Sequence, residues 1–112
     1  MVQVCDGDQI ILDLTNHLAN GEGATVHFHG LYQKFTPYMD GVPMITQCPV
    51  VPHTTFRYNF TAEHSGTHWW HAHTGMQRAD GLFGALTVRQ SNEVCYIHTT
   101  RSGTRTSMYI PA

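Results

Sequence analysis

The chain has 112 residues, of which 41% are hydrophobic and 12% are charged, and its formal net charge is −2. This length suits one domain with a real core, and this composition is typical of a globular chain rather than a disordered one. The six Lys and Arg residues are scattered, so nothing indicates a nucleic-acid partner or an anionic membrane surface. No apolar stretch approaches the roughly 20 residues of a membrane helix. Residues 1–6 also lack the basic region and apolar core of a signal peptide.

Alternation of apolar and polar residues predicts β-strands, because no segment keeps an apolar helical period for three turns. A strand is predicted over residues 10–15, after a turn at residues 6–8. A glycine-rich break at residues 20–23 then precedes a strand over residues 24–29. Residues 36–53 are predicted to be mostly irregular loop, because prolines recur along them.

The second half of the chain continues the strand pattern. Residues 55–60 alternate aromatic with polar side chains, residues 67–73 follow a Ser-Gly turn signal, and residues 82–88 form the last clear strand. Together these segments predict an all-β sandwich or barrel. Residues 91–112 are rich in Ser, Thr and Arg without a clear pattern, so we expect a linker or loose tail outside a domain of residues 1–90.

Two histidine pairs are the most informative residues of the chain. His27 and His29 lie two positions apart in one predicted strand, and His71 and His73 lie two positions apart in another. Side chains at this spacing point to the same face of a strand, roughly 6.5–7 Å apart. Two such strands facing each other would form a cluster of four imidazoles. Imidazole suits copper, zinc, iron and nickel, and four of them exceed what one catalytic zinc needs, so the spacing favours a site shared by several metals.

Five motifs follow one another in a fixed order along the chain. They are His27-Phe28-His29-Gly30, Met39-Asp40-Gly41-Val42-Pro43, Thr46-Gln47-Cys48-Pro49, the run from Gly66 to Gly75, and the run from Gln77 to Gly84. In this order they resemble the first cupredoxin domain of a multicopper oxidase, most of all the laccases of arthropods. The resemblance covers residues 2–89. It implies a cupredoxin-like Greek-key β-sandwich, incomplete at the N-terminus because the usual opening strands before Val2 are missing.

The resemblance implies a role for each histidine of the two pairs. His27 corresponds to a ligand of the type 2 copper, and His29, His71 and His73 correspond to ligands of the type 3 copper pair. Enzymes of this family reduce O₂ to water at the trinuclear site, with electrons delivered from a blue type 1 copper. Asp40 corresponds to an acidic residue beside the cluster that assists proton delivery. Such a role is chemically reasonable, because a carboxylate near copper-bound water can orient it and relay protons.

The same resemblance implies that the type 1 copper lies outside this chain. Blue copper needs two histidines and a cysteine, and Cys48 is followed by Pro49 without a histidine-rich partner strand. We therefore expect later cupredoxin domains to complete the enzyme, and the isolated chain to be inactive. The expected partners are O₂ and a phenolic or diphenolic substrate, with ferrous iron or ascorbate as alternatives. A non-catalytic copper- or zinc-binding module and an inactive gene fragment are the other interpretations that stay open.

The other histidines, the tryptophans and Asp80 are expected to lie outside the set of metal ligands. His68 lies on the opposite strand face from His71, which indicates packing or a place around the cluster rather than metal binding. Trp69 and Trp70 are expected to form core and pocket wall, and Asp80-Gly81 is expected to form a turn or an outer part of the cluster. The other histidines are expected to be solvated; they are His17, His53, His64 and His98.

The cysteines and a glycosylation sequon bear on the compartment of the protein. Three cysteines are an odd number, and both isolated buried thiols and a Cys5–Cys48 bridge fit the sequence. Asn59-Phe60-Thr61 is an N-glycosylation sequon, which has a use only in a secreted protein. The family resemblance implies secretion, whereas composition alone leaves the compartment open.

Overall fold

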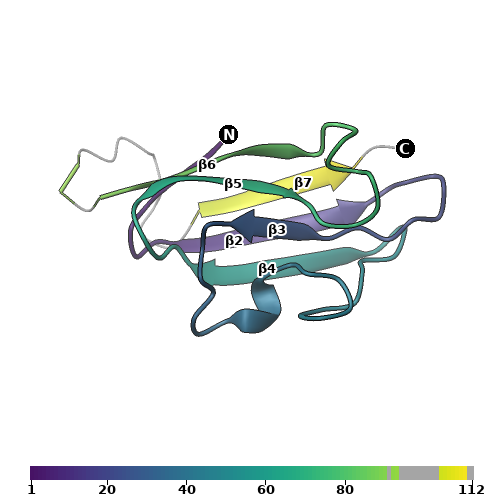
Figure 1. The fold of residues 1–112 in the computed structure, drawn as a ribbon, viewed down its shortest axis with the longest axis horizontal. Helices are drawn as coiled ribbons and strands as arrows, with labels where there is room; N and C mark the ends of the chain where they lie inside the picture. The colour runs from purple at the N-terminus through teal and green to yellow at the C-terminus, as the bar shows by residue number, and fades with distance from the viewer. Residues whose placement is uncertain (91, 94–103, 111–112) are drawn as a thin grey trace.

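The computed structural model describes residues 1–90, 92–93 and 104–110 as two β-sheets packed face to face (Figure 1). The four-stranded sheet has the order β1 (Val2–Cys5), β6 (Phe83–Arg89), β5 (Gly66–Ala72), β3 (Val26–His29). The three-stranded sheet has the order β4 (Thr55–Thr61), β2 (Gln9–Asn16), β7 (Thr104–Ile110). A 3₁₀ turn, η1 (Pro37–Met39), lies in the proline-rich loop. The all-β sandwich expected from the sequence is confirmed.

The core lies between the two sheets and is built from the alternating apolar positions of the strands. Leu12 and Tyr58 of the three-stranded sheet and Phe28 and Leu86 of the four-stranded sheet are each at most 2% exposed. The ring of Phe28 lies 5.4 Å from that of Tyr58 across the sandwich, at an interplanar angle of 76°. Burying side chains of this size stabilises a fold by about 1.5–3 kcal/mol each. No helix among the described residues has the length and apolar character required to cross a membrane.

Tyr58 also joins the two sheets through a buried polar contact. The backbone N–H of Val26 in β3 donates to the Tyr58 hydroxyl oxygen at 3.0 Å. Burial raises the pKa of Tyr58 to about 12, so the hydroxyl stays neutral over the physiological range. The contact fixes the start of β3, one residue before His27, against the core.

The prediction of a loose tail is wrong for residues 104–110. These residues form β7, which pairs in parallel with β2 from Ile10↔Thr104 to Asn16↔Ile110. Ile110 is 5% exposed and belongs to the core, and the partly buried Met108 packs against it. The partner strand lies far away along the chain, so no local pattern announces this pairing. The domain boundary at residue 90 stays a prediction.

The cysteines also differ from both expected arrangements. Cys48 is a free cysteine and is exposed, whereas Cys5 is disulfide-bonded. The Cys5–Cys48 bridge is therefore wrong, and so is the interpretation of Cys5 as an isolated thiol. Cys48 follows the turn at residues 43–47, on the solvent side of the loop, and Cys5 ends β1. Cys95 lies outside the described residues.

Candidate metal centre

Antiparallel pairing of β3 with β5 brings the two histidine pairs together. The register places His27 directly opposite His71, and their ring centroids are 5.3 Å apart. The His29 ring lies 5.6 Å from that of His27 and 5.8 Å from that of His71. One potential ligand atom from each of these three residues lies within 4.8 Å of the others. The predicted convergence of the two strands is therefore present in the fold.

His73 lies at the edge of this group, one residue past the end of β5. Its ring centroid is 5.5 Å from that of His27 and 5.8 Å from that of His71, where the two rings stack at 24°. His73 is exposed, and the tight set of ligand atoms is formed by the other three histidines. All four imidazoles nevertheless line one region of the four-stranded sheet, and we refer to them as the histidine cluster.

Backbone carbonyls orient the two central rings. Nδ1 of His27 donates to the backbone oxygen of Asp40 at 2.7 Å, and Nδ1 of His71 donates to the backbone oxygen of Ala72 at 2.9 Å. A carbonyl only accepts, so the neutral form of each ring carries its proton on Nδ1 and its lone pair on Nε2. Hydrogen bonding of the second ring nitrogen is the usual way in which proteins orient a metal-binding histidine.

His71 supplies the test of whether the cluster fits a metal ion. The residue is 3% exposed, and its Nε2 is buried without a hydrogen-bond partner among the described residues. Burial lowers the pKa of His71, and the nearby His27 ring acts in the same direction. The ring is therefore neutral at pH 7, and no described residue bonds the lone pair of Nε2. A borderline-soft cation such as copper or zinc matches that donor, because both accept neutral imidazole.

Asp40 lies behind His27, on the side of the ring that carries Nδ1. Its carboxylate oxygen Oδ1 is 3.3 Å from His27 Nδ1, and its side chain is 27% exposed. Gly41 makes this approach possible: its φ is +78°, and a Cβ at this position would lie 1.8 Å from the backbone oxygen of Val26. The loop after η1 can thus lie directly on β3 only with glycine at position 41.

A set of contacts that the sequence did not reveal holds the His73 segment to the start of β3. The His73 backbone N–H donates to the Thr25 carbonyl at 3.2 Å. Gln77 is 6% exposed, and its Nε2 donates to the Gly23 carbonyl at 2.9 Å and to Glu22 Oε2 at 3.2 Å. Gln77 is part of a quoted motif, but its role depends on a long-range contact that spacing along the chain does not show.

The other singled-out residues lie away from the cluster or form its wall. The Trp69 ring packs on His71 with centroids 4.2 Å apart and is thus a wall of the site, as expected. His68 bonds the His64 backbone oxygen at 2.9 Å, outside the cluster. The ring centroids of His17 and His53 lie 6.3 Å apart, away from the cluster. Asp80 lies in a turn, and its backbone N–H donates to the Met76 carbonyl. His98 lies outside the described residues.

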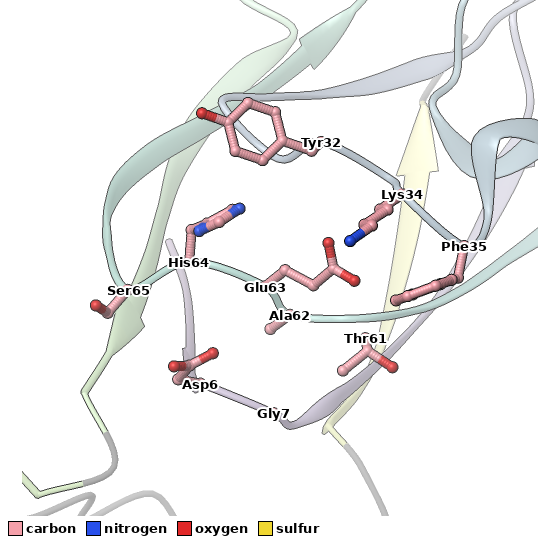
Figure 2. A pocket seen from close by; sticks show the side chains of 10 residues that line it. All are labelled: Asp6, Gly7, Tyr32, Lys34, Phe35, Thr61, Ala62, Glu63, His64 and Ser65. Carbon is pink, nitrogen blue, oxygen red and sulfur yellow. The ribbon is translucent and has the colours of Figure 1, made fainter.

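A separate pocket of about 680 Å³ opens between the turn at Asp6-Gly7, the residues that follow β4, and the loop after β3. Figure 2 shows Lys34 and Glu63 extending into this hollow from opposite walls. The ring of Tyr32 lies 4.5 Å from that of His64 at its rim. None of the four clustered histidines lines the pocket, so its polar groups belong to a different surface.

The fold and the histidine cluster define a β-sandwich with a histidine-rich candidate metal centre, and comparison with known proteins gives the family. Residues 1–93 match the sequence profile described as Multicopper oxidase, and the chain belongs to that family. It is 50% identical over 94 residues to "Laccase-1" of Cryptococcus neoformans var. neoformans serotype D, which covers 83% of this chain and 15% of the laccase. It is 49% identical over 82 residues to "L-ascorbate oxidase" of Brassica rapa subsp. pekinensis, covering 73% of this chain and 14% of that enzyme.

The fold likeness agrees with the sequence likeness. The crystal structure of Fet3p, described as a multicopper oxidase that functions in iron import, superposes with a TM-score of 0.77 at 40% identity. The match covers 88% of this chain and 18% of Fet3p. The expected cupredoxin-like fold of a first multicopper oxidase domain is thereby confirmed. The chain spans about 15% of the length of the laccase that it matches.

Proposed function

We propose that this chain is the first domain of a laccase-like enzyme and supplies half of a trinuclear copper site that reduces O₂ to water. In this proposal His27 binds the type 2 copper, and His29, His71 and His73 bind the type 3 pair. The observation that carries the proposal is the buried Nε2 of His71, which has no partner among the described residues. It belongs to a set of three histidines with ligand atoms within 4.8 Å of one another. Copper supplies one-electron redox chemistry when bound, since it cycles between two oxidation states.

The residues of this chain prepare the site in three ways. The Asp40 and Ala72 carbonyls hold the rings of His27 and His71 with Nε2 presented. The Trp69 ring covers the flank of His71 and keeps water from that side. The Asp40 carboxylate, which reaches solvent and lies 3.3 Å from His27 Nδ1, is placed to hold and pass a proton beside the cluster.

An exposed apolar surface on this domain supports contact with further domains of the enzyme. Several large apolar side chains in the loop after β3 are more than half exposed: Tyr32, Phe35, Tyr38, Met44 and Ile45. An exposed group of this kind is typical of an interaction surface. We propose that later cupredoxin domains of the same enzyme cover this loop and bring the missing copper ligands and the type 1 copper.

The reducing substrate and the compartment are part of the same proposal. We propose a phenol or diphenol, supported by the 50% identity to a laccase. The similarity to an iron-import oxidase and to ascorbate oxidase makes ferrous iron and ascorbate the alternatives to test. We also propose that the protein is secreted, because the disulfide at Cys5 is typical of oxidising compartments.

The test is a metal analysis of the full-length protein with single alanine substitutions. Replacing any one of His27, His29, His71 or His73 should lower the copper content and abolish O₂ consumption with a diphenol. His17→Ala and His53→Ala are matched controls outside the cluster and should keep both properties. Equal copper loss in the two groups would overturn the assignment. Full copper content without O₂ consumption by the unsubstituted protein would instead favour a binding module without catalysis.

A further inference from the structure

We propose that Asn59 carries an N-linked glycan, attached through its side-chain nitrogen Nδ2. The sequence holds one Asn-x-Ser/Thr sequon, Asn59-Phe60-Thr61, and the middle residue is not proline. Sequons occur by chance, so the inference depends on where the structure places this one. It rests on the secretory route in the proposed function, which the disulfide at Cys5 supports independently of copper.

The strand geometry puts the sequon on the outer face of the sandwich. In β4, Tyr58 and Phe60 are buried in the core, whereas Asn59 and Thr61 are exposed between and beyond them. Successive side chains of a strand alternate faces, so Asn59 points away from the four-stranded sheet that carries the histidine cluster. A glycan here would extend into solvent without crossing the candidate metal centre.

The individual atoms of Asn59 are compatible with attachment. Oδ1 accepts a hydrogen bond from Gln9 Nε2 at 2.7 Å, and Nδ2 has no hydrogen-bond partner among the described residues. Glycosylation forms a bond from Nδ2 to the anomeric carbon of a sugar. The bond from that carbon to a lipid pyrophosphate donor breaks, and the nitrogen loses one proton. The amide oxygen is unchanged by this reaction, so the contact with Gln9 survives it.

The position in the sheet gives the glycan a physical role. β4 is an edge strand, and an open edge is a template for pairing with another chain. On the open side of β4, the backbone N–H of Asn59 donates to the Met39 sulfur at 3.5 Å. On the outer face, Asn59 stands opposite Ile11, a partly exposed apolar residue. A sugar at Asn59 would cover Ile11 and hinder the approach of a second strand.

The experiment is site-specific mapping of the full-length protein, expressed in a eukaryotic host from its complete coding sequence. Enzymatic release of N-glycans in ¹⁸O-water should convert Asn59 into labelled Asp and lower the apparent mass on a gel. Asn59→Gln and Thr61→Ala should abolish the label and the mass shift. Thr61→Ala leaves Asn59 and its contact with Gln9 in place, so it separates the modification from folding. Thr61→Ser is the matched control and should retain both signals.

The outcomes separate this inference from the proposed function, because copper content and O₂ consumption are measured on the same preparation. Secreted, copper-loaded and active protein with unmodified Asn59 would overturn the glycan and leave the function standing. A labelled Asn59 in protein without copper or O₂ consumption would support the glycan and contradict the function. Protein that stays inside the cell with unmodified Asn59 would contradict the glycan together with secretion.

Discussion

The two sheets satisfy their polar side chains in opposite ways. On the outer face of the three-stranded sheet, side chains of β2 and β4 bond one another: Asp13 accepts from Arg57 at 2.6 and 2.9 Å, and the Thr15 and Thr55 hydroxyls are 2.9 Å apart. On the four-stranded sheet, His27 and His71 are also cross-strand neighbours, but each binds a backbone carbonyl instead of the other ring.

This difference separates groups that serve the fold from groups prepared for a ligand. Asp13 and Arg57 bond each other directly, and the hydrogen bonds and the charge of Asp13 raise the pKa of Arg57. In the histidine cluster, Nδ1 of each central ring bonds a backbone carbonyl, and one ligand atom from each of His27, His29 and His71 lies within 4.8 Å of the others. A buried donor or acceptor without a partner lowers the unfolding free energy. The unpartnered nitrogen of His71 therefore destabilises the fold unless a ligand binds there.

The largest effect should come from Asp40, on the histidine side of this comparison. In the full-length enzyme, Asp40→Asn should slow O₂ reduction by about 10²–10⁴-fold, because proton transfer is lost while the backbone carbonyl that holds His27 remains. Copper content should stay near that of the unsubstituted enzyme. The measurements are oxygen-electrode rates and metal analysis of one preparation. Loss of most of the copper would show that Asp40 serves the fold or the metal instead.

Gly41→Ala should destabilise the protein by about 3 kcal/mol, from an overpacked contact with the Val26 carbonyl added to backbone strain at positive φ. Gly7→Ala is the control, because Gly7 has φ +88° and no atom within 4 Å of the added Cβ. It should cost only the strain, about 1 kcal/mol. Denaturant unfolding of both variants measures the difference, and equal costs would mean that the Asp40 loop does not depend on contact with β3.

Tyr58→Phe tests the link between the sheets. Loss of the hydroxyl leaves the Val26 N–H buried without its partner, and should cost about 1–3 kcal/mol of unfolding free energy at pH 7. The substitution should also change the alkaline limb of stability. Between the ordinary tyrosine pKa of 10.0 and the folded value of about 12, the unfolded chain releases the proton and the folded chain keeps it, so stability falls as pH rises. In Tyr58→Phe the unfolding free energy should fall less steeply with pH. Urea unfolding at pH 9–12 measures this dependence, and the same dependence in both proteins would contradict the buried contact.

The smallest effect is expected at Thr55, on the self-paired outer face. Thr55→Val keeps the shape and removes an exposed hydrogen bond, so the unfolding free energy should change by no more than about 0.5 kcal/mol. Urea unfolding beside Tyr58→Phe gives the comparison. A cost as large as that of Tyr58→Phe would mean that the outer polar pairs contribute as much as the buried ones, and the contrast between the sheets would fail.

Local pattern was sufficient for much of the molecule. Alternation of apolar and polar residues predicted strands where β2 and β4 lie, and the spacing of two between His27 and His29 placed both rings on one side of β3. The ordered motifs then implied, through the family resemblance, that the four histidines of the two strands belong to one cluster. Both kinds of signal depend on residues close together in the sequence, and for that reason they are readable without a structure.

What local pattern missed depends on partners far away in the chain. β7 pairs with β2, whose paired residues lie more than ninety positions away along the chain. The side chain of Gln77 donates to the Gly23 carbonyl. The disulfide state of Cys5 likewise depends on three-dimensional proximity and not on spacing. Nor does the sequence show that His73 lies at the exposed rim while His71 is almost fully buried, because both occupy the same side of the strand pattern.

That gradient of burial has a consequence for the energetics of metal uptake. His71 is immobilised by folding, and the side chain of His27 is 18% exposed, so their rotamer entropy has already been lost before an ion arrives. His29 and His73 are exposed and keep that freedom until they are ligated. An ion would therefore meet two preorganised donors first, and the outer pair would close around it at an entropic cost. If the cluster binds an ion, its release should begin with the exposed outer rings, because these regain rotamer freedom when they lose contact with the ion.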